Sequence, residues 1–155
     1  RNKSAAFKQK VNAIIHQYDV VFCDDFKERI RYLENLPSFE FDIIALGGHF
    51  DKEISSEYAN PTQWDRIFRI NNMGGTYGYI LKRNVYDYII RNYQYNFGAD
   101  EFYALHVYRH FKSYAFVPFL AGCRPCKSEI TGQEHVYLNV GWHYTQKGLP
   151  ELNHL

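Results

Sequence analysis

The sequence has no apolar run that approaches the roughly 20 residues needed to cross a bilayer, and no signal-peptide pattern precedes its first elements. We therefore expect no membrane span in this chain. Neither sign of charge predominates, because 18 Lys and Arg are interspersed with 17 Asp and Glu and the formal net charge is +1. This balance gives no electrostatic basis for binding nucleic acid, so small molecules and glycans are the expected ligands.

Cysteine and methionine are also scarce. The three cysteines, Cys23, Cys123 and Cys126, do not pair off, and Cys23 lies in an apolar stretch. A reducing, cytoplasmic compartment is therefore favoured, while a secretory-pathway or viral origin stays open. The sole methionine is Met73, so we expect further residues upstream of Arg1, and with them part of the fold.

Aromatic residues, in contrast, are abundant. Fourteen Tyr and twelve Phe can fill a core and can also offer stacking faces to sugars and bases. A chain of 155 residues fits one domain. We predict a single domain over 1–155, with an α/β core over 1–118 and an irregular tail over 119–155 that packs on it.

The hydrophobic pattern predicts helices and strands in alternation. Helices are expected at 4–17, 26–33 and 84–92 and from 98 onwards, and strands at 18–23, 41–46, 66–70, 76–81, 114–117 and 136–140. The strand at 66–70 alternates charged and apolar residues like an edge strand, with the strand at 76–81 as its partner, whereas 49–63 reads as a surface loop. The order predicts a mostly parallel sheet flanked by helices.

Two adjacent carboxylates, Asp24 and Asp25, follow the uninterrupted apolar run at 20–23. In open α/β sheets ligands collect at the carboxyl ends of buried strands, and a divalent cation offsets the repulsion between neighbouring carboxylates. We therefore expect a cation here, with Asp25 as its anchor and Asp24 beside it. The alternative is that one of the two simply caps the helix beginning at Phe26.

Other metal-like patterns are less complete. His106 and His110 are four residues apart on one predicted helix and could share a metal, although such histidines are more often half-exposed helix residues. Cys123 and Cys126 have the spacing of a zinc half-site or a redox pair. No second such pair exists, and the motif does not open a helix after a strand, so a loop with two thiols is favoured.

Taken in order, the motifs resemble the glycosyltransferases of family 25, the lipopolysaccharide and collagen galactosyltransferase type, over about residues 5–131. Each motif is short, so the weight lies in the series. After the first predicted helix the series runs through Cys23-Asp24-Asp25, the strand ending at Gly47-Gly48, then Gly75-Thr76-Tyr77-Gly78-Tyr79 and Gly98-Ala99-Asp100-Glu101-Phe102. The family has Glu where this chain has Cys23, and its first strand and helix would precede Arg1.

The resemblance implies a GT-A fold, Rossmann-related and lacking its N-terminal part, and an inverting, metal-assisted transfer. The donor would be a nucleoside-diphosphate sugar, UDP-linked, that gives a hexose (galactose or glucose) to a glycan or glycoprotein. Mn²⁺ or Mg²⁺ would be held by Asp25 and Asp24, with His143 of the tail added to its shell, and Asp24 could instead face the ribose or the donor sugar. Gly75 and Thr76 would belong to the nucleotide site.

Inverting transfer also needs a general base beside the acceptor hydroxyl. Asp100 is the first candidate and Glu101 the reserve, since the helix start cannot be fixed from periodicity. The competing interpretation makes Asp100 an N-cap. Two other interpretations also stay open. One is an inactive relative that holds a nucleotide or glycan without turnover, as the replacement of Glu by Cys23 suggests. The other is an unrelated α/β fold in which Asp24 and Asp25 only cap a helix.

Overall fold

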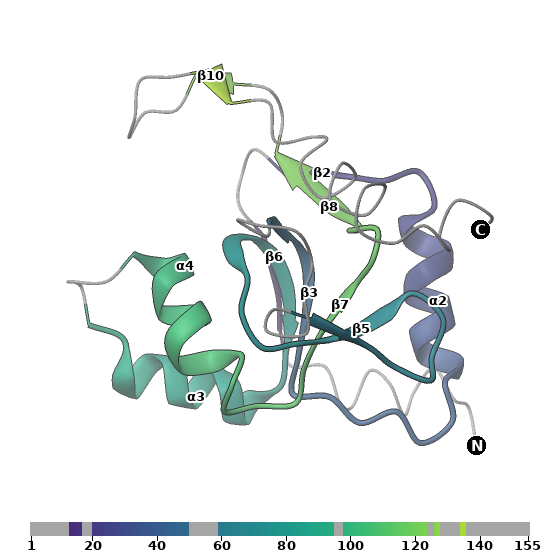
Figure 1. The fold of residues 1–155 in the computed structure, drawn as a ribbon, viewed down its shortest axis with the longest axis horizontal. Helices are drawn as coiled ribbons and strands as arrows, with labels where there is room; N and C mark the ends of the chain where they lie inside the picture. The colour runs from purple at the N-terminus through teal and green to yellow at the C-terminus, as the bar shows by residue number, and fades with distance from the viewer. Residues whose placement is uncertain are drawn as a thin grey trace.

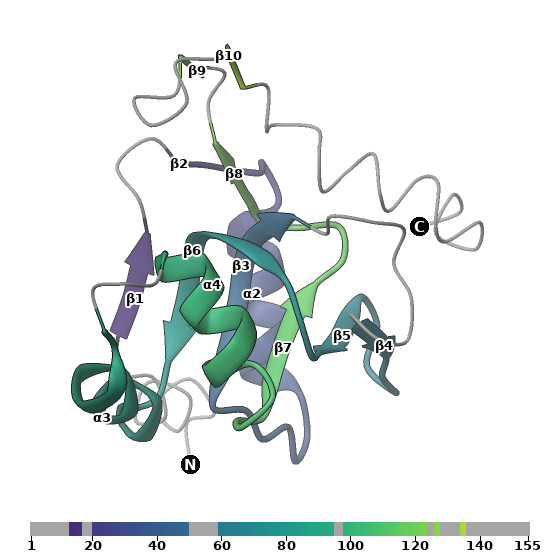
Figure 2. The same cartoon turned by 60° about the vertical axis from the view of Figure 1, so that its left-hand side comes forward.

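The computed structural model describes residues 13–16, 20–49, 59–94, 98–123, 126–127 and 134–135. At its centre is a six-stranded sheet (Figure 1) in the order β1-β6-β3-β7-β5-β4, with β1 at one edge and β4 at the other (Figure 2). Its strands are β1 (Ala13–His16), β3 (Ile43–His49), β4 (Ala59–Pro61), β5 (Ile67–Ile70), β6 (Gly74–Leu81) and β7 (Ser113–Phe116). The fold is therefore mixed α/β.

The sheet is mixed rather than mostly parallel, which corrects the expectation from the sequence. Strand β3 pairs in parallel with β7 but antiparallel with β6, and β6 is also antiparallel to β1. The expectation failed because it took the alternating order of helices and strands as a sign of a parallel sheet. Among the described residues no helix separates β3 from β6, and strands joined without a helical crossover can pair antiparallel.

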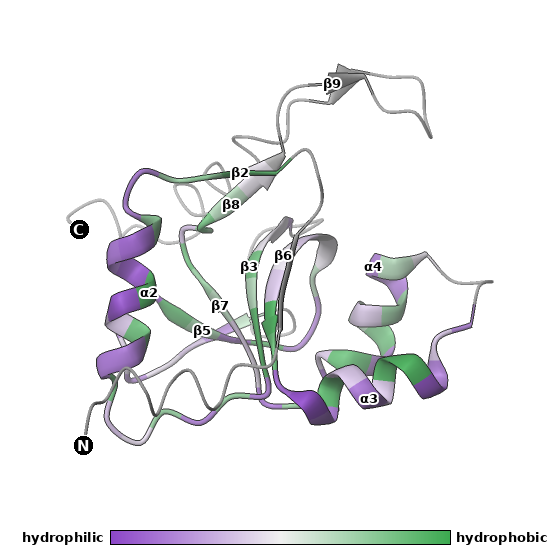
Figure 3. Ribbon diagram, turned by 180° about the vertical axis from the view of Figure 1, so that it is seen from behind, coloured by the Kyte–Doolittle hydropathy of each residue, from purple (hydrophilic) through white to green (hydrophobic). Residues whose placement is uncertain are grey.

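Helices form a layer on each face of the sheet. Helix α2 (Phe26–Asn35) covers one face, while α3 (Arg83–Asn92) and α4 (Ala99–Phe102), which continues as the π-helix η1 (Tyr103–Val107), cover the other. Strand β3 supplies both cores by alternation, because Ile43 packs with the α3–α4 layer and Ile44 with the α2 layer. Helix α2 carries both hydrophilic and hydrophobic residues along its length, as expected of a helix with one face on the core (Figure 3).

The predicted helices at 26–33, 84–92 and 98 onwards are confirmed as α2, α3 and α4, and the strands at 41–46, 76–81 and 114–117 as β3, β6 and β7. The helix predicted at 4–17 is wrong where the structure describes it, since Ala13–His16 is strand β1. Two adjacent β-branched residues, Ile14 and Ile15, fit a strand better than a helix. Residues 4–12 of that prediction lie outside the described residues.

The strand predicted at 18–23 exists as β2 (Val20–Phe22), but it is neither buried nor part of the central sheet. It pairs antiparallel with β8 (Ala121–Cys123) in a separate two-stranded sheet, and Phe22 is 38% exposed. The expectation that the acid pair ends a strand covered on both faces is therefore wrong. A three-residue apolar run needs only one covered face, and Val20 packs against the core on the α2 side of the sheet.

Strand β5 is not an edge strand, and β6 is not its partner. Strand β5 lies between β7 and β4, and β4 falls within the segment predicted to be a loop. Pro61, which lacks a backbone N–H, ends β4 at the true edge of the sheet. The polar residue of β5 that suggested a wet face, Arg69, donates to the carbonyl of Phe111 and lies over the ring of Tyr114 instead.

Beyond residue 118 the structure describes β8, β9 (Cys126–Lys127) and β10 (Glu134–His135), of which β9 and β10 pair with each other. The strand predicted at 136–140 and the tail residue His143 lie outside the described residues. Among the described helices, none has the length and apolar character that a bilayer crossing requires.

Candidate functional site

One edge of the central sheet gathers several strand ends. Since β1 and β3 are both antiparallel to β6, and β3 is parallel to β7, strands β1, β3 and β7 run in the same direction. Their carboxyl ends and the start of β6 therefore lie on the same side of the sheet, across the ends of the strands. We call this side the carboxyl edge. In open α/β sheets ligands bind outside such an edge, so the residues of the carboxyl edge form the candidate site.

His49 ends β3 at the carboxyl edge and lies against a pair of glycines. A Cβ on Gly74 would be 2.5 Å from Nε2 of His49, and a Cβ on Gly75 would be 3.0 Å from Nδ1. Gly75 also has a φ of +73°, in the left-handed region that favours glycine. The Tyr77 hydroxyl lies 3.4 Å from Nδ1 of His49, so these four residues, the His49 cluster, fix the imidazole at the edge.

Gly75, which the resemblance assigns to the nucleotide site, thus lies at the carboxyl edge. Thr76 follows it on β6, and the structure describes its backbone only. His49 was not recognised in the sequence, where it appeared only as the first residue of a loop. The signal that could have found it is its position directly after a buried strand that ends in Gly47-Gly48, where ligands and close backbone approach are both expected.

Asp25 occupies the N-cap position of α2, but its side chain makes no capping hydrogen bond. The Nε of Arg29 donates to Oδ2 of Asp25 at 2.7 Å, and the same guanidinium donates through Nη1 to the Pro118 carbonyl at 3.0 Å. A hydrogen bond from the Cys23 thiol, followed by the Arg29 charge, holds the pKa of Asp25 below its usual value. Burial, and then the Asp25 carboxylate, raise the pKa of the Cys23 thiol to about 12. Asp25 is therefore an ionised group whose partners come from the protein itself.

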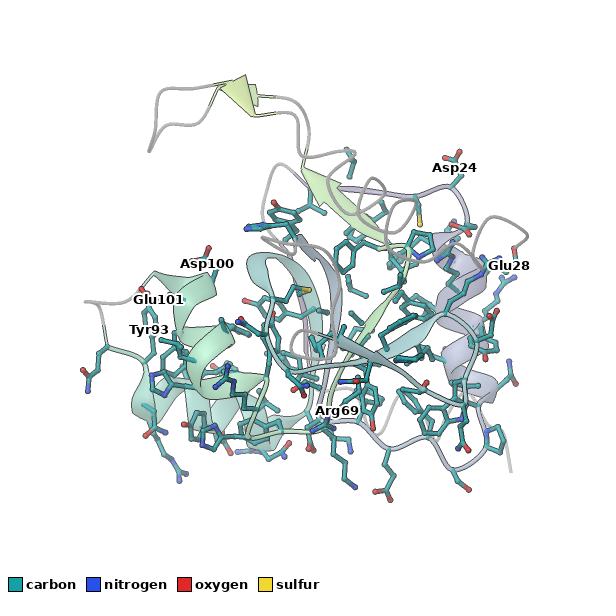
Figure 4. All side chains as sticks on the ribbon, in the orientation of Figure 1. Asp24, Glu28, Arg69, Tyr93, Asp100 and Glu101 are labelled. Carbon is teal, nitrogen blue, oxygen red and sulfur yellow. The ribbon has the colours of Figure 1, made fainter. Side chains whose placement is uncertain are left out.

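Asp24, by contrast, is exposed and points away from the sheet beyond the start of α2 (Figure 4). Within the described ranges no ion pair or hydrogen bond involves it, and no set of three or more His, Cys, Asp or Glu side chains there could hold a metal ion. The geometry of Asp24 and Asp25 does not fit a shared divalent cation, because one carboxylate is neutralised by Arg29 and the other faces away. His143, the third expected ligand, lies outside the described residues.

Asp100 and Glu101 lie in the first turn of α4, on the other face of the sheet from Asp24 (Figure 4). Gly98 is the N-cap, so the interpretation of Asp100 as a cap is wrong. Its Oδ1 instead accepts from the backbone N–H of Glu101 at 3.0 Å. Asp24 and Asp100, which belong to the two pairs of acids expected to share one site, thus lie with the sheet between them.

A group of buried phenols lies beside Asp100. Burial, then Tyr79, and then the charge of Asp100 raise the pKa of the fully buried Tyr108. The Tyr103 hydroxyl donates to that of Tyr79, with the two rings 4.9 Å apart. Tyr103 opens the π-helix η1, and such single π-turns within helices are frequent at functional sites. Sequence reasoning missed this feature, since π-turns have no simple periodicity.

The histidines of this layer do not form the metal pair considered from their spacing. The His106 ring packs against Phe102 at 5.2 Å, and the His110 ring stacks on Tyr88 at 6.2 Å, both between ring centroids. Each is thus an aromatic packing residue of the α3–α4 layer.

Comparisons of the chain with protein-family models, with curated proteins and with solved structures found no match.

Proposed function

We propose that the chain is part of a glycosyltransferase of GT-A type that moves a hexose, galactose or glucose, from a UDP-linked sugar to a glycan or glycoprotein. The observation that carries the proposal is the meeting of strand ends at the carboxyl edge with the glycine pair Gly74 and Gly75. The order of motifs that resembles family 25 supplies the reaction class. Glycines without side chains let backbone approach a diphosphate or a sugar closely.

In this proposal the His49 cluster lies on the donor side. Charge that develops on the departing diphosphate is stabilised by fixed hydrogen-bond donors, and an imidazole held by packing needs little reorganisation to act as one. The glycines opposite its ring hold it in place, and Tyr77 orients it. His49 therefore binds and orients the donor, while Gly75 leaves room for the phosphates.

On the acceptor side, Asp100 is the proposed general base. The acceptor hydroxyl loses its proton as its oxygen attacks the anomeric carbon and the bond to the diphosphate breaks, so a carboxylate must lie within hydrogen-bond reach. Asp100 is half-buried at the start of α4, whereas Glu101 is exposed. Within the described part of the chain no ion pair occupies the Asp100 carboxylate, unlike that of Asp25, so it is available to an acceptor hydroxyl.

A divalent cation, Mn²⁺ or Mg²⁺, would add Lewis-acid stabilisation of the diphosphate when bound. Asp25 does not fit it as a ligand, because Arg29 already pairs with the Oδ2 atom. No step is therefore assigned to a metal held by the acid pair. The same ion pair favours a second candidate function, the binding of a nucleotide or glycan without turnover.

Calorimetric titration with UDP and an assay of UDP release from UDP-galactose and UDP-glucose, each with and without Mn²⁺, test these functions. The matched variants are His49→Gln and, as control, His106→Gln, whose ring packs on Phe102. We expect UDP binding that His49→Gln weakens about tenfold or more and that His106→Gln leaves unchanged. Binding without UDP release supports the second function, and absence of both defeats the proposal.

A further inference from the structure

A cavity of about 340 Å³ lies between α2 and the turn before β5, apart from the His49 cluster and Asp100. Its wall on α2 contains Asp25, Glu28, Arg29 and Tyr32, and its opposite wall contains Asp65 and Arg66. The backbone N–H of Asp65 donates to the Tyr32 hydroxyl at 3.0 Å, which ties the two walls together. Glu28 marks this side of the molecule in Figure 4, across the sheet from Asp100.

Arg66 presents a donor without an acceptor. Its Nε atom is buried and has no hydrogen-bond partner among the described residues, and the Asp65 carboxylate 3.7 Å away is beyond hydrogen-bond distance. A buried donor left unpaired is costly, so the Arg66 guanidinium is held in the cavity wall against a desolvation penalty. The backbone of Arg66 has a φ of +55°, in the left-handed region that few residues other than glycine adopt.

The charges of the cavity indicate the kind of ligand. The Asp25 carboxylate is neutralised by Arg29 at 2.7 Å, and Asp65 lies next to Arg66, which leaves Glu28 as the excess charge. An anion would meet Glu28, and a cation would meet two guanidinium groups, so neither sign is favoured. A neutral ligand that both donates to carboxylates and accepts from Arg66 satisfies every group, and hydroxyl groups do both.

We propose that this cavity is a binding site for a neutral saccharide, of one or two hexose units. Its volume is at the lower end of the range of about 300–1,000 Å³ typical of small-ligand pockets, which suits a ligand of that size. The Tyr32 ring adds an amphipathic wall for the apolar face of a sugar. The proposal stands on the cavity itself and goes beyond the transferase reaction, because it places saccharide recognition on the α2 face.

Saturation-transfer NMR and calorimetry with the full chain test it, using methyl galactoside, methyl glucoside and lactose, with inorganic phosphate and acetate for comparison. Two variants remove cavity groups, Arg66→Asn and Glu28→Gln. Asn adopts a positive φ more readily than Arg does, so Arg66→Asn keeps the turn. Their controls are Arg31→Asn and Glu34→Gln, which change residues of α2 outside the cavity.

We expect at least one saccharide to bind and each cavity variant to weaken it about tenfold, while the controls bind as the parent chain does and all variants unfold cooperatively. Binding of phosphate or acetate in place of the sugars would overturn the assignment, as would saccharide binding that both cavity variants leave intact, or no binding at all. UDP binding, measured on the same samples, keeps the two proposals apart. Saccharide binding without UDP binding or release supports the saccharide site and contradicts the transferase. UDP binding and release without saccharide binding supports the transferase and contradicts the saccharide site.

Discussion

The two faces of the sheet carry similar acids in opposite electrostatic environments. On the α2 face the Asp25 carboxylate accepts from Arg29 at 2.7 Å and from the Cys23 thiol, and its pKa is lowered. On the α4 face Asp100 accepts from the backbone N–H of Glu101 and lies near the buried phenol of Tyr108, whose pKa it helps to raise. The Asp25 carboxylate is thus paired with an internal cation, whereas no ion pair among the described residues involves Asp100.

The largest expected effect comes from removing the charge on the α4 face. Asp100→Asn should leave UDP binding intact and slow UDP release with acceptor about a hundredfold or more, because the general base is lost. The measurement is the turnover rate at saturating donor. Asp87→Asn, which changes an exposed acid of α3 in the same layer, is the control. A similar loss in Glu101→Gln, with Asp100→Asn active, would transfer the role to Glu101.

Next in size is a steric change at the carboxyl end of β3. A Cβ on Gly47 would be 2.2 Å from the backbone oxygen of Ala121 in β8, so Gly47→Val forces β8 and its partner β2 away from the sheet. Overpacking of this kind costs about 1–3 kcal/mol of unfolding free energy, measured by urea denaturation. Gly98→Ala is the control, since among the described residues its Cβ would meet only the Asp100 and Glu101 side chains. Equal stability of the two variants would contradict the close contact between β8 and β3.

A smaller effect is expected from removing the arginine that pairs with Asp25 on the α2 face. Arg29→Met removes the ion pair and the hydrogen bond to the Pro118 carbonyl, and we expect a loss of about 1 kcal/mol in unfolding free energy, because the Asp25 side chain is 41% exposed and partly screened. UDP binding should not change. Arg31→Met, an exposed position on the same helix, is the control. If UDP binding fell with Arg29→Met and not with Arg31→Met, Asp25 and Arg29 would belong to the UDP site.

The smallest effect is a pH dependence. The pKa of Asp25 is lower in the folded chain than in the unfolded one, so its contribution to stability is present above the unfolded value of about 3.8 and is lost as the pH falls through the folded value. Urea midpoints of the parent chain and of Asp25→Asn should therefore differ at pH 6 and converge in acid. A difference that grows towards low pH would mean that the pKa is raised instead.

Much of the fold was predictable because its signals are local. The helical periods that mark α2 and α3, and the apolar runs that mark β3, β6 and β7, are short-range patterns, and the elements they predicted are present. Most of the failures concern pairing, although residues 13–16 were also predicted as helix and form strand β1, and β4 lies in a segment predicted to be a loop. Arg69 made β5 look like an edge strand, but its charge is accommodated by Phe111 and Tyr114, which are more than 40 residues away. No window of sequence contains that information.

The candidate site was predictable in its parts and not in its assembly. Gly75 and Asp100 could be singled out from their motifs, and the pairing of Asp25 with Arg29 could have been read from their i, i+4 spacing on a helix. Arg66 could not, because it gains its significance from contacts between distant segments, and for His49 the sequence offers only its position after a buried strand. The start of β6 beside the imidazole, and the residues of α2 that share a cavity with Arg66, were decided by the tertiary structure.

The sequence by itself determined where most of the helices and strands form and which face of each is apolar, since these follow from backbone propensity and side-chain spacing. Only the tertiary structure decided the strand order and the directions of the strands, and so placed Asp24 and Asp100 on opposite faces of one sheet. The physical reason is that strand pairing and helix docking depend on surfaces formed by residues far apart in the chain. Their match is a property of the folded whole.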